Sequence, residues 1–500
     1  MKKNQFSPRR AISALAFVAL AALTLASCAV DGYDDESFSG GVSGQTLNSP
    51  AADSIVFTAN ADGSKTTITW PVVLGAGGYR CSVYNVNDEQ NPVAIIADTL
   101  VDGTSLVVPR SEDTNYSFSI QTIGNAQLNN ADAANATVAS FSSYLPGFAT
   151  IPDGADIAEW LSQNAIPEDS GEIALDLVPG GHYTLNANAE FGNAPVTLRT
   201  ASENRATITV GEDASFVIKA GFRLKNLVID AAACTNPLIL MNKEPNPATL
   251  DIRPAATSKG YYFIEDPVVI VNTLIDNLPD EVINDNKTQY VLSTFLIDNS
   301  IIHFNTATGH SSNGSYFNFY DQNGGINQLT LRNSTLYNSS DKQMRYIIRY
   351  SNGYRPARAG YDNMGVTFDH TTLYNLVPTG QSANYGGVRG AGKSCTITLD
   401  HNIVVNTSHN QFVRRLLGGD PWTGDVVKAF NSNTYVYDGQ DAWTMPDPND
   451  VSTWTGEISY DQSGTVISGD PGFADADKGD FTVSSGAQIA AKSGDPRWLK

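Results

Sequence analysis

Two aspartates, Asp369 and Asp400, hold the same place in successive copies of a short repeated segment. The copies read Phe-Asp-His-Thr-Thr-Leu and Leu-Asp-His-Asn-Ile-Val, and Arg332 holds this place one copy earlier. If the copies stack as neighbouring strands about 4.8 Å apart, the two carboxylates repel unless a cation or a proton separates them. Calcium takes several oxygen ligands, so Asp369 and Asp400 are candidate calcium ligands. The alternative is a solvated charge ladder in which Arg332 neutralises Asp369.

Arginines gather in a second segment of the same copies. The run Met-Arg-Tyr-Ile-Ile-Arg-Tyr at 344–350 puts Arg345 and Arg349 on one face of a strand and the aromatic residues on the other. Later copies add Arg389 and Arg414. Because arginine binds carboxylates through two parallel N–H groups and stacks on rings, these residues predict a groove for an acidic ligand. Pairing with the protein's own excess of acids is the alternative.

Three tryptophans, Trp422, Trp443 and Trp454, lie in a region rich in Gly, Asp and Pro at 418–460. Exposed indoles stack on the apolar faces of sugar rings, so these residues are candidates for a sugar-binding platform. They would equally serve as the small core that holds a long loop together.

The elements that must position these residues form an irregular repeat. Its segments begin at Leu224, Ile270, Ile297, Leu331, Phe368, Leu399 and Phe430. The first position is always large and apolar, and the third is Asn, Asn, Asn, Asn, His, His and Ser. Strand alternation predicts that both positions point inward, where stacked polar side chains such as His370 and His401 would bond to one another. This asparagine-ladder pattern predicts a right-handed parallel β-helix over 150–500.

The two ends of this region are expected to be closed. Asp156 and Glu159 form a capping-box pattern, and Ile157, Trp160 and Leu161 follow at helical spacing. A short helix at about 156–164 should therefore cover the first coil. Residues 470–498 are expected to form a terminal coil and cap.

The N-terminus carries an export signal. Residues 1–27 combine four basic residues, an apolar run and small residues before Cys28. The sequence Leu-Ala-Ser-Cys resembles a bacterial lipobox, which implies that Cys28 is lipidated. The acidic run at 31–36 resembles the signal that places Bacteroidota lipoproteins on the outer leaflet of the outer membrane, facing the medium. Residues 28–50 are expected to form a flexible acidic tether.

Residues 51–142 alternate between apolar and polar residues in short runs, which predicts a β-sandwich. Trp70, Tyr79 and Tyr116 resemble the pattern of a fibronectin type III domain, with Tyr116 as the corner tyrosine. The predicted fold class is therefore all-β, with an N-terminal sandwich followed by the β-helix.

Composition excludes one class of partner. The 500 residues include 52 acidic and 31 basic ones, a net charge of −21, and removal of residues 1–27 takes away four positive charges. A net charge of 27 minus 52, or −25, argues against nucleic acid, whose phosphates need a basic surface. The three remaining cysteines predict no disulfide framework.

The whole pattern resembles Bacteroidota surface lipoproteins that join a fibronectin-like module to a pectin-lyase-like β-helix and occur in polysaccharide-utilisation systems. The resemblance implies capture of a polysaccharide, expected to contain uronates, together with glycan-uptake proteins. A calcium-dependent polysaccharide lyase remains open, with Asp369 and Asp400 holding the metal and Arg349 or Arg389 as the base. A structural spacer without a ligand is the third possibility.

Overall fold

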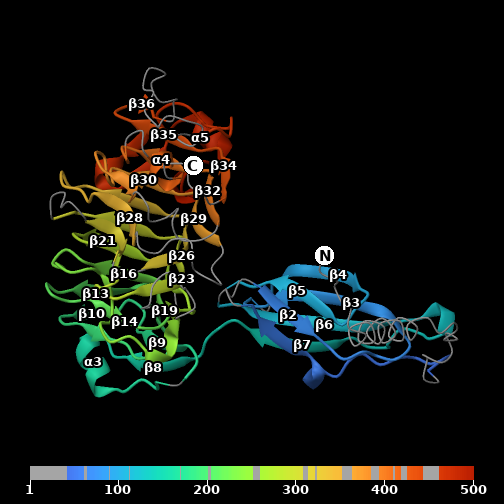
Figure 1. Cartoon of the computed structure of the whole chain (residues 1–500). Coiled ribbons are helices and arrows are strands. Elements are labelled where there is room, and N and C mark those ends of the chain that lie inside the picture. Colours follow the sequence, from blue (N-terminus) through green and yellow to red (C-terminus); the bar gives the residue numbers. More distant parts are fainter. Residues whose placement is uncertain are drawn as a thin grey trace, which may run out of the picture. The chain divides into compact units, whose positions relative to one another are not determined.

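The computed structural model describes residues 42–60, 65–88, 90–111, 113–168, 170–200, 204–251, 260–307, 314–320, 324–351, 363–384, 394–408, 412–417, 425–442 and 461–500. The chain divides into two compact units, Met1–Leu145 and Pro146–Lys500 (Figure 1). Almost all of the regular structure in both units is β-strand, so the predicted all-β class is confirmed. None of the helices within these described ranges is long and apolar enough to cross a bilayer.

The first unit contains two antiparallel sheets. One has the order β1-β2-β5 and the other β4-β3-β6-β7. Their strands are β1 (Val56–Ala59), β2 (Lys65–Thr69), β3 (Ala76–Asn85), β4 (Val93–Val101), β5 (Ser105–Pro109), β6 (Asn115–Gly124) and β7 (Thr137–Ser142), with the 3-10 turns η1 (Ala52–Ser54) and η2 (Ala126–Leu128). Ile68, Val83 and Phe118 are fully buried in the core of this sandwich. The Tyr116 hydroxyl accepts from Ser111 N–H at 2.6 Å and donates to the Ser111 carbonyl at 3.1 Å, which ties the loop before β6 to that strand.

The second unit is a right-handed parallel β-helix built from three sheets. The twelve-stranded sheet contains β8 (Gly147–Ile151), β9 (Ile173–Leu177), β12 (Val196–Thr200), β15 (Phe222–Lys225), β18 (Leu250–Asp251), β19 (Tyr261–Ile264), β20 (Val268–Val271), β23 (Tyr290–Asp298), β26 (Gly325–Arg332), β29 (Asn363–Asp369), β32 (Ser394–Asp400) and β34 (Asp425–Asn431). The ten-stranded sheet contains β10 (His182–Leu185), β13 (Ala206–Val210), β16 (Leu227–Asp230), β21 (Leu274–Leu278), β24 (Ile301–Phe304), β27 (Thr335–Asn338), β30 (Thr372–Tyr374), β33 (Ile403–Val405), β35 (Thr434–Tyr437) and β36 (Gln440–Asp441). The seven-stranded sheet contains β11 (Ala189–Glu190), β14 (Phe216–Ile218), β17 (Ile239–Met241), β22 (Ile283–Asn284), β25 (Ser315–Phe319), β28 (Tyr346–Tyr350) and β31 (Gln381–Ala383).

The repeated segments stack in the register that the sequence predicts. Leu331 pairs with Ile297 on one side and Phe368 on the other, and the chain of pairs runs without a break from Leu224 to Phe430. These first-position residues are buried or nearly buried, and they line one wall of the core between the three sheets. The large apolar residue at the first position therefore sets the register of the twelve-stranded sheet.

The prediction for the third position is wrong. Every residue at this position adopts a positive φ between 46° and 57°, from Asn226 to Ser432, and lies at the short corner between the twelve-stranded and ten-stranded sheets. We call this edge the αL corner. A residue in the left-handed backbone conformation turns the chain. The alternation of side chains between the two faces of the strand therefore does not continue through this residue. Asn is frequent here because its short polar side chain tolerates αL, and His370 and His401 share this outward position.

The inward polar residues instead occupy the fourth position. They are Thr273, Ser300, Ser334, Thr371, Asn402 and Asn433, each at most 1% exposed. Five of the six accept a hydrogen bond from the backbone of the coil before them; for example, Ser300 N–H donates to Ser334 Oγ at 3.0 Å, and Asn402 N–H donates to Asn433 Oδ1 at 3.0 Å. Thr371 Oγ1 donates to the Leu331 carbonyl of that coil at 3.1 Å. The internal ladder of polar side chains therefore exists, but the fourth position of the repeat forms it instead of the third.

Replacing a corner residue should separate backbone strain from lost contacts. We expect Asn299→Val to lower the free energy of unfolding by about 1–2 kcal/mol more than Asn299→Gly, because a β-branched residue is strained at a φ of 46° and glycine is not. Both variants lose the side-chain bonds of Asn299 to Asn272 and Arg497, so their difference isolates the backbone. Denaturant unfolding measures it, and equal midpoints for the two variants would contradict the expectation.

The first coil is covered by α3 (Ile157–Gln163), in the region where a helix was expected at about 156–164. Asp156 caps it by accepting from Glu159 N–H at 2.9 Å, and Ile157 is fully buried. The C-terminal residues do not form another coil. They contain β37 (Phe473–Asp475) and β38 (Asp480–Val483), which pair with each other, with η5 (Ala476–Lys478), α5 (Gly486–Ala491) and η6 (Pro496–Trp498).

This C-terminal segment packs on the outward face of the ten-stranded sheet. The Asp495 carboxylate is buried and accepts from Thr335 Oγ1 at 2.8 Å, while Trp498 Nε1 donates to the same hydroxyl at 2.8 Å. Phe481 packs edge-on against Tyr337, with ring centroids 5.0 Å apart. The ten-stranded sheet is therefore partly covered.

Candidate functional site

Long connections border the seven-stranded sheet. At the αL corner one or two residues join the sheets in each of the seven repeated coils, whereas the chain between the seven-stranded and twelve-stranded sheets is long in several coils. We call this second edge the loop corner. Its described part includes residues 242–251 and 260–267, with η3 (Pro247–Thr249) and the β18–β19 pair. Variable loops on a rigid scaffold are where binding residues concentrate, so the outward face of the seven-stranded sheet is the candidate site.

Polar residues form a column on this outward face. Asn284 pairs with Asn318, and Asn318 pairs with Arg349 on the next strand. The Arg349 guanidinium carbon lies 3.5 Å from the centroid of the Tyr320 ring, and Tyr320 is 39% exposed. On the opposite face of β28, Ile348 and Tyr350 are buried in the core. The structure thus presents an arginine on an aromatic ring, with amides beside it.

Arg345 precedes the same strand. It is half-buried, and its guanidinium carbon lies 5.1 Å from the centroid of the Tyr346 ring. Arg414 lies on a helix that contacts β31, the last strand of this sheet. The segment that was expected to form another arginine-bearing strand is the helix α4 (Phe412–Leu417), because Phe412, Val413, Leu416 and Leu417 follow helical spacing and are buried. Arg389, Trp422, Trp443, Trp454 and Cys28 lie outside the described residues.

A buried carboxyl lies beside the amide column. Glu281 is 7% exposed, its Oε1 accepts from Asn318 Nδ2 at 2.9 Å, and its Oε2 accepts from Asn284 Nδ2. Burial raises the pKa of Glu281 to about 8 although these amides lower it, and burial raises the pKa of the adjacent Asp280 to about 6. Glu281 is therefore largely protonated at neutral pH. Nothing in its sequence surroundings indicated this role, because its burial depends on the packing of two coils.

The two predicted metal ligands lie on another edge. Asp369 and Asp400 are directly paired on neighbouring strands, as the repeat predicted. Each carboxylate contacts the histidine that follows it, Asp369 Oδ1 lying 2.6 Å from His370 Nδ1 and Asp400 Oδ1 lying 2.6 Å from His401 Nδ1. The imidazole rings of His370 and His401 stack with centroids 4.7 Å apart. The expected inward position of these histidines is therefore wrong.

Arg332 lies beside Asp369, with which it is paired on the neighbouring strand, as the repeat predicted. Its NH2 group also binds Asp298 Oδ2 at 2.8 Å, on the strand before it. Asn431 Nδ2 donates to Asp400 Oδ1 at 3.1 Å. Among the residues with described positions, no group of three His, Cys, Asp or Glu side chains is arranged to hold a metal ion.

The structure does not bring Arg349 to this acidic pair. Arg349 lies on the seven-stranded sheet, whereas Asp369 ends β29 at the αL corner. The whole of β29, seven residues at roughly 3.3 Å each, or about 23 Å, separates the loop corner from Asp369. The predicted calcium ligands and Arg349, one of the two predicted bases, therefore belong to different edges of the coil.

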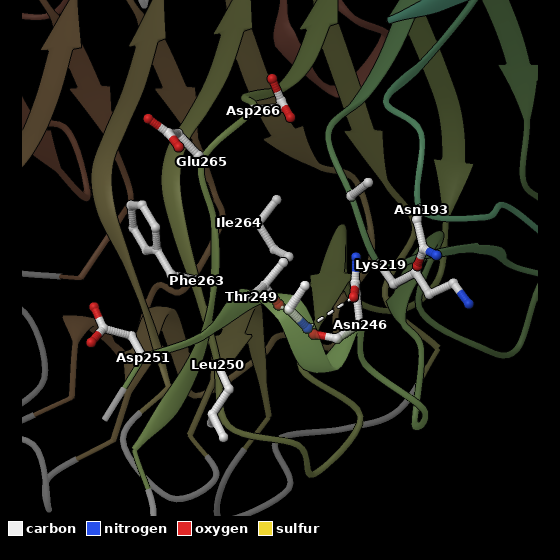
Figure 2. A pocket seen from close by; sticks show the side chains of 12 residues that line it. Asn193, Lys219, Asn246, Thr249, Leu250, Asp251, Phe263, Ile264, Glu265 and Asp266 are labelled. Atoms are coloured by element: carbon white, nitrogen blue, oxygen red, sulfur yellow. Dashed lines mark hydrogen bonds between the residues drawn. The ribbon is translucent and has the colours of Figure 1, made fainter. Parts of the chain in front are cut away.

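A cavity of about 560 Å³ opens at the loop corner of the first coils (Figure 2). Four chain segments contribute to it: residue 193 after β11, residues 219–220 after β14, residues 246–251, and residues 263–266 before β20. Sequence reasoning missed this cavity, because its wall is assembled from three coils that are far apart in the chain.

Comparisons with known proteins match the chain in parts. Models of three domains of unknown function match it, DUF4992 at residues 1–188, DUF4957 at 181–339 and DUF5123 at 366–498. No curated protein sequence matches. A family 28 exopolygalacturonase from Yersinia enterocolitica is 8% identical with a TM-score of 0.28, covering 79% of this chain and 87% of its own. Pectate lyase PelI from Erwinia chrysanthemi, in complex with tetragalacturonic acid, is 10% identical with a TM-score of 0.19, covering 66% and 85%.

Proposed function

We propose that the protein binds a uronate-containing polysaccharide along the outward face of the seven-stranded sheet. The observation that carries this proposal is the stack of Arg349 on Tyr320, beside the amide of Asn318. A guanidinium held on a ring keeps its planar fork in place, and such a fork matches the geometry of a carboxylate. The exposed ring of Tyr320 offers an apolar surface to a sugar.

The protonated Glu281 supports an acidic ligand. Below the pH at which Glu281 ionises, the column from Asn284 to Arg349 carries no negative charge from this carboxyl. The Glu281 carboxyl then does not repel an anionic ligand that approaches the arginine. A protein with a net charge of −21 needs such a local arrangement to hold an acidic polymer.

Location is a second part of the proposal and rests on the sequence alone. Residues 1–27 would be removed, and lipid on Cys28 would anchor the protein in the outer membrane. The acidic residues at 31–36 would direct it to face the medium. There it would capture glycan for partner uptake proteins.

Affinity electrophoresis in gels that contain polygalacturonate, alginate or a neutral glucan tests the proposal. We expect retardation by an acidic polymer and a Kd about tenfold higher for Arg349→Ala, since one charge-assisted bidentate contact contributes on the order of 1.5–3 kcal/mol. Arg332→Ala is the matched control, because it removes the same charge at the αL corner. Failure of both acidic polymers to retard the folded protein, or equal weakening by the two variants, would refute the proposal.

A further inference from the structure

A histidine on the ten-stranded sheet contacts a carboxylate with one ring nitrogen and a serine with the other. His303 Nδ1 lies 2.6 Å from Asp276 Oδ1, and His303 Nε2 lies 2.8 Å from Ser339 Oγ. Asp276 belongs to β21, His303 belongs to β24 and Ser339 follows β27, so three successive coils supply the three side chains. Among the histidines whose positions are described, only His303 has a serine hydroxyl on its second ring nitrogen.

The local backbone and an aromatic ring hold these side chains in place. β21 has one extra residue in its pairing with β24, so Asp276 and Asn277 together oppose His303. Asn277 adopts a φ of 57°, and an extra residue of this kind re-aims the side chain beside it. The Tyr337 ring stacks on the imidazole of His303 with centroids 4.4 Å apart and 5° between the planes, which fixes the orientation of the imidazole.

The contacts of His303 determine which groups donate. An ionised carboxylate only accepts hydrogen bonds, so His303 Nδ1–H donates to Asp276. In a neutral imidazole the other nitrogen is then the acceptor, and the Ser339 hydroxyl donates to His303 Nε2. The serine is thereby held where the histidine can remove its proton, which is the arrangement of an activated nucleophile. The His303 side chain is 13% exposed, whereas Ser339 is exposed and open to a substrate.

An amide side chain lies beside the serine. Ser339 N–H donates to the Phe304 carbonyl at 3.0 Å, which continues the pairing of β24 with β27 by one residue and brings Asn305 opposite Ser339. Asn305 lies two residues after His303, so strand alternation directs both side chains to the outward face. Side-chain amides are among the donors that stabilise the negative oxygen formed during acyl transfer.

We infer that Asp276, His303 and Ser339 form a hydrolytic site for esters of small carboxylic acids. Ser339 is the nucleophile, His303 is the general base and acid, and Asp276 is the positioning residue. The polar residues Ser340 and Lys342 follow the nucleophile and offer no apolar surface to a long acyl chain. An ester suits the site better than an amide, because an alcohol leaves more readily than an amine. The inference does not rest on the proposed function.

The reaction is an acyl transfer in two halves. Ser339 Oγ attacks the carbonyl carbon of the ester while His303 Nε2 takes the hydroxyl proton, and the Asn305 amide donates to the oxygen that becomes negative. The bond between the carbonyl carbon and the leaving oxygen then breaks. His303 gives its proton to that oxygen, so an alcohol departs and an acyl-serine remains. Water attacks the acyl-serine in the same way, its proton passes through His303 to Ser339 Oγ, and the carboxylic acid is released.

Hydrolysis of 4-nitrophenyl acetate and covalent labelling by diisopropyl fluorophosphate test this assignment on the purified protein. We expect hydrolysis above the rate in buffer, and a diisopropylphosphoryl group on Ser339 that mass spectrometry locates. Ser339→Ala should abolish the label, and both Ser339→Ala and His303→Gln should lower kcat/KM by about 100-fold or more. Ser340→Ala is the matched control, because it removes the adjacent hydroxyl, which donates to the Thr306 carbonyl at 2.8 Å. This control should keep both the rate and the label.

Asp276→Asn tests the positioning residue. It keeps the size of the side chain but removes the charge that fixes the tautomer of the imidazole. We therefore expect kcat and the rate of labelling to fall by at least about tenfold while KM stays unchanged. His370→Gln removes a histidine that is bound to an aspartate but not to a serine, and it should alter neither quantity.

Circular dichroism and the melting temperature verify that each variant is folded. The assignment is overturned if the native protein neither hydrolyses the ester nor takes up the label. It is equally overturned if the label is found only at other residues, or if Ser339→Ala and Ser340→Ala hydrolyse the ester at the same rate.

Discussion

Asn402→Ala is expected to lower the free energy of unfolding of the β-helix by about 3 kcal/mol. Asn402 is 1% exposed, its Oδ1 accepts from Thr371 N–H at 3.0 Å, and its Nδ2 donates to the Phe368 carbonyl at 2.8 Å. Alanine leaves that N–H buried without this acceptor and removes a bond to that carbonyl, and an unpaired buried group alone costs about 1–3 kcal/mol. Because each coil contacts only its neighbours, the loss weakens the stacking on both sides.

Two further variants of the same region isolate the cause. Asn402→Ser keeps an acceptor of the kind that Ser300 offers to Thr273 N–H at 3.1 Å, so we expect an intermediate loss of about 1–2 kcal/mol. Asn431→Ala removes an exposed side chain on the neighbouring coil and should cost less than about 1 kcal/mol. Denaturant unfolding followed by circular dichroism gives the three values. If Asn402→Ala destabilises no more than Asn431→Ala, the internal ladder does not contribute as described.

Glu281→Gln is expected to remove a large pH dependence of stability. The pKa of this carboxyl rises from 4.5 to about 8 on folding, chiefly because of burial. A raised pKa means that the folded state holds the proton more tightly, so the stabilisation is complete below pH 4.5 and is lost as the pH rises through about 8. At about 1.4 kcal/mol per pKa unit, the native protein loses on the order of 3–5 kcal/mol across this range through Glu281.

Glutamine remains neutral at every pH, so the variant should be more stable than the native protein at pH 8 and above. Its amide can also bond to Asn318, whose Oδ1 is buried and has no partner among the described residues, after a half-turn of the Asn318 side chain. A smaller slope between pH 3.8 and about 6 should persist, since Asp280 keeps its raised pKa. Unfolding midpoints from pH 5 to 9 measure the effect, and Glu190→Gln, an exposed position on the same sheet, is the control. An unchanged pH profile in Glu281→Gln would contradict the expected role of this carboxyl.

The pH behaviour of Glu281 bears on ligand binding as well. Asn318 lies between Glu281 and Arg349, bonded to the first and paired with the second. Ionisation of Glu281 above about pH 8 would place a negative charge beside Asn318, which is the residue paired with Arg349 on the neighbouring strand. Stability and affinity for an acidic polymer should therefore decline over the same pH range.

The sequence by itself determined the β-helix and the register of its repeated segments. Large apolar residues such as Leu331 and Phe368 recur at one position, and burying them leaves a single way to stack the coils, so the pairing of Asp369 with Asp400 followed directly. The helix α3 could also be predicted from local sequence, because Asp156 is sufficient to cap it and the apolar spacing after Asp156 determines which face is buried.

Only the tertiary structure decided where the coil turns and which side chains meet. One residue at positive φ moved His370 from the expected interior to the surface and gave the internal ladder to Asn402 instead. The same turns placed Asp369 and Arg349 on different edges, and they gathered Lys219 and Asp266 around one cavity from separate coils. The alternation of inward and outward side chains holds only within one strand. After a corner the chain runs in a new direction, so the alternation before the corner does not predict which side chains point inward after it.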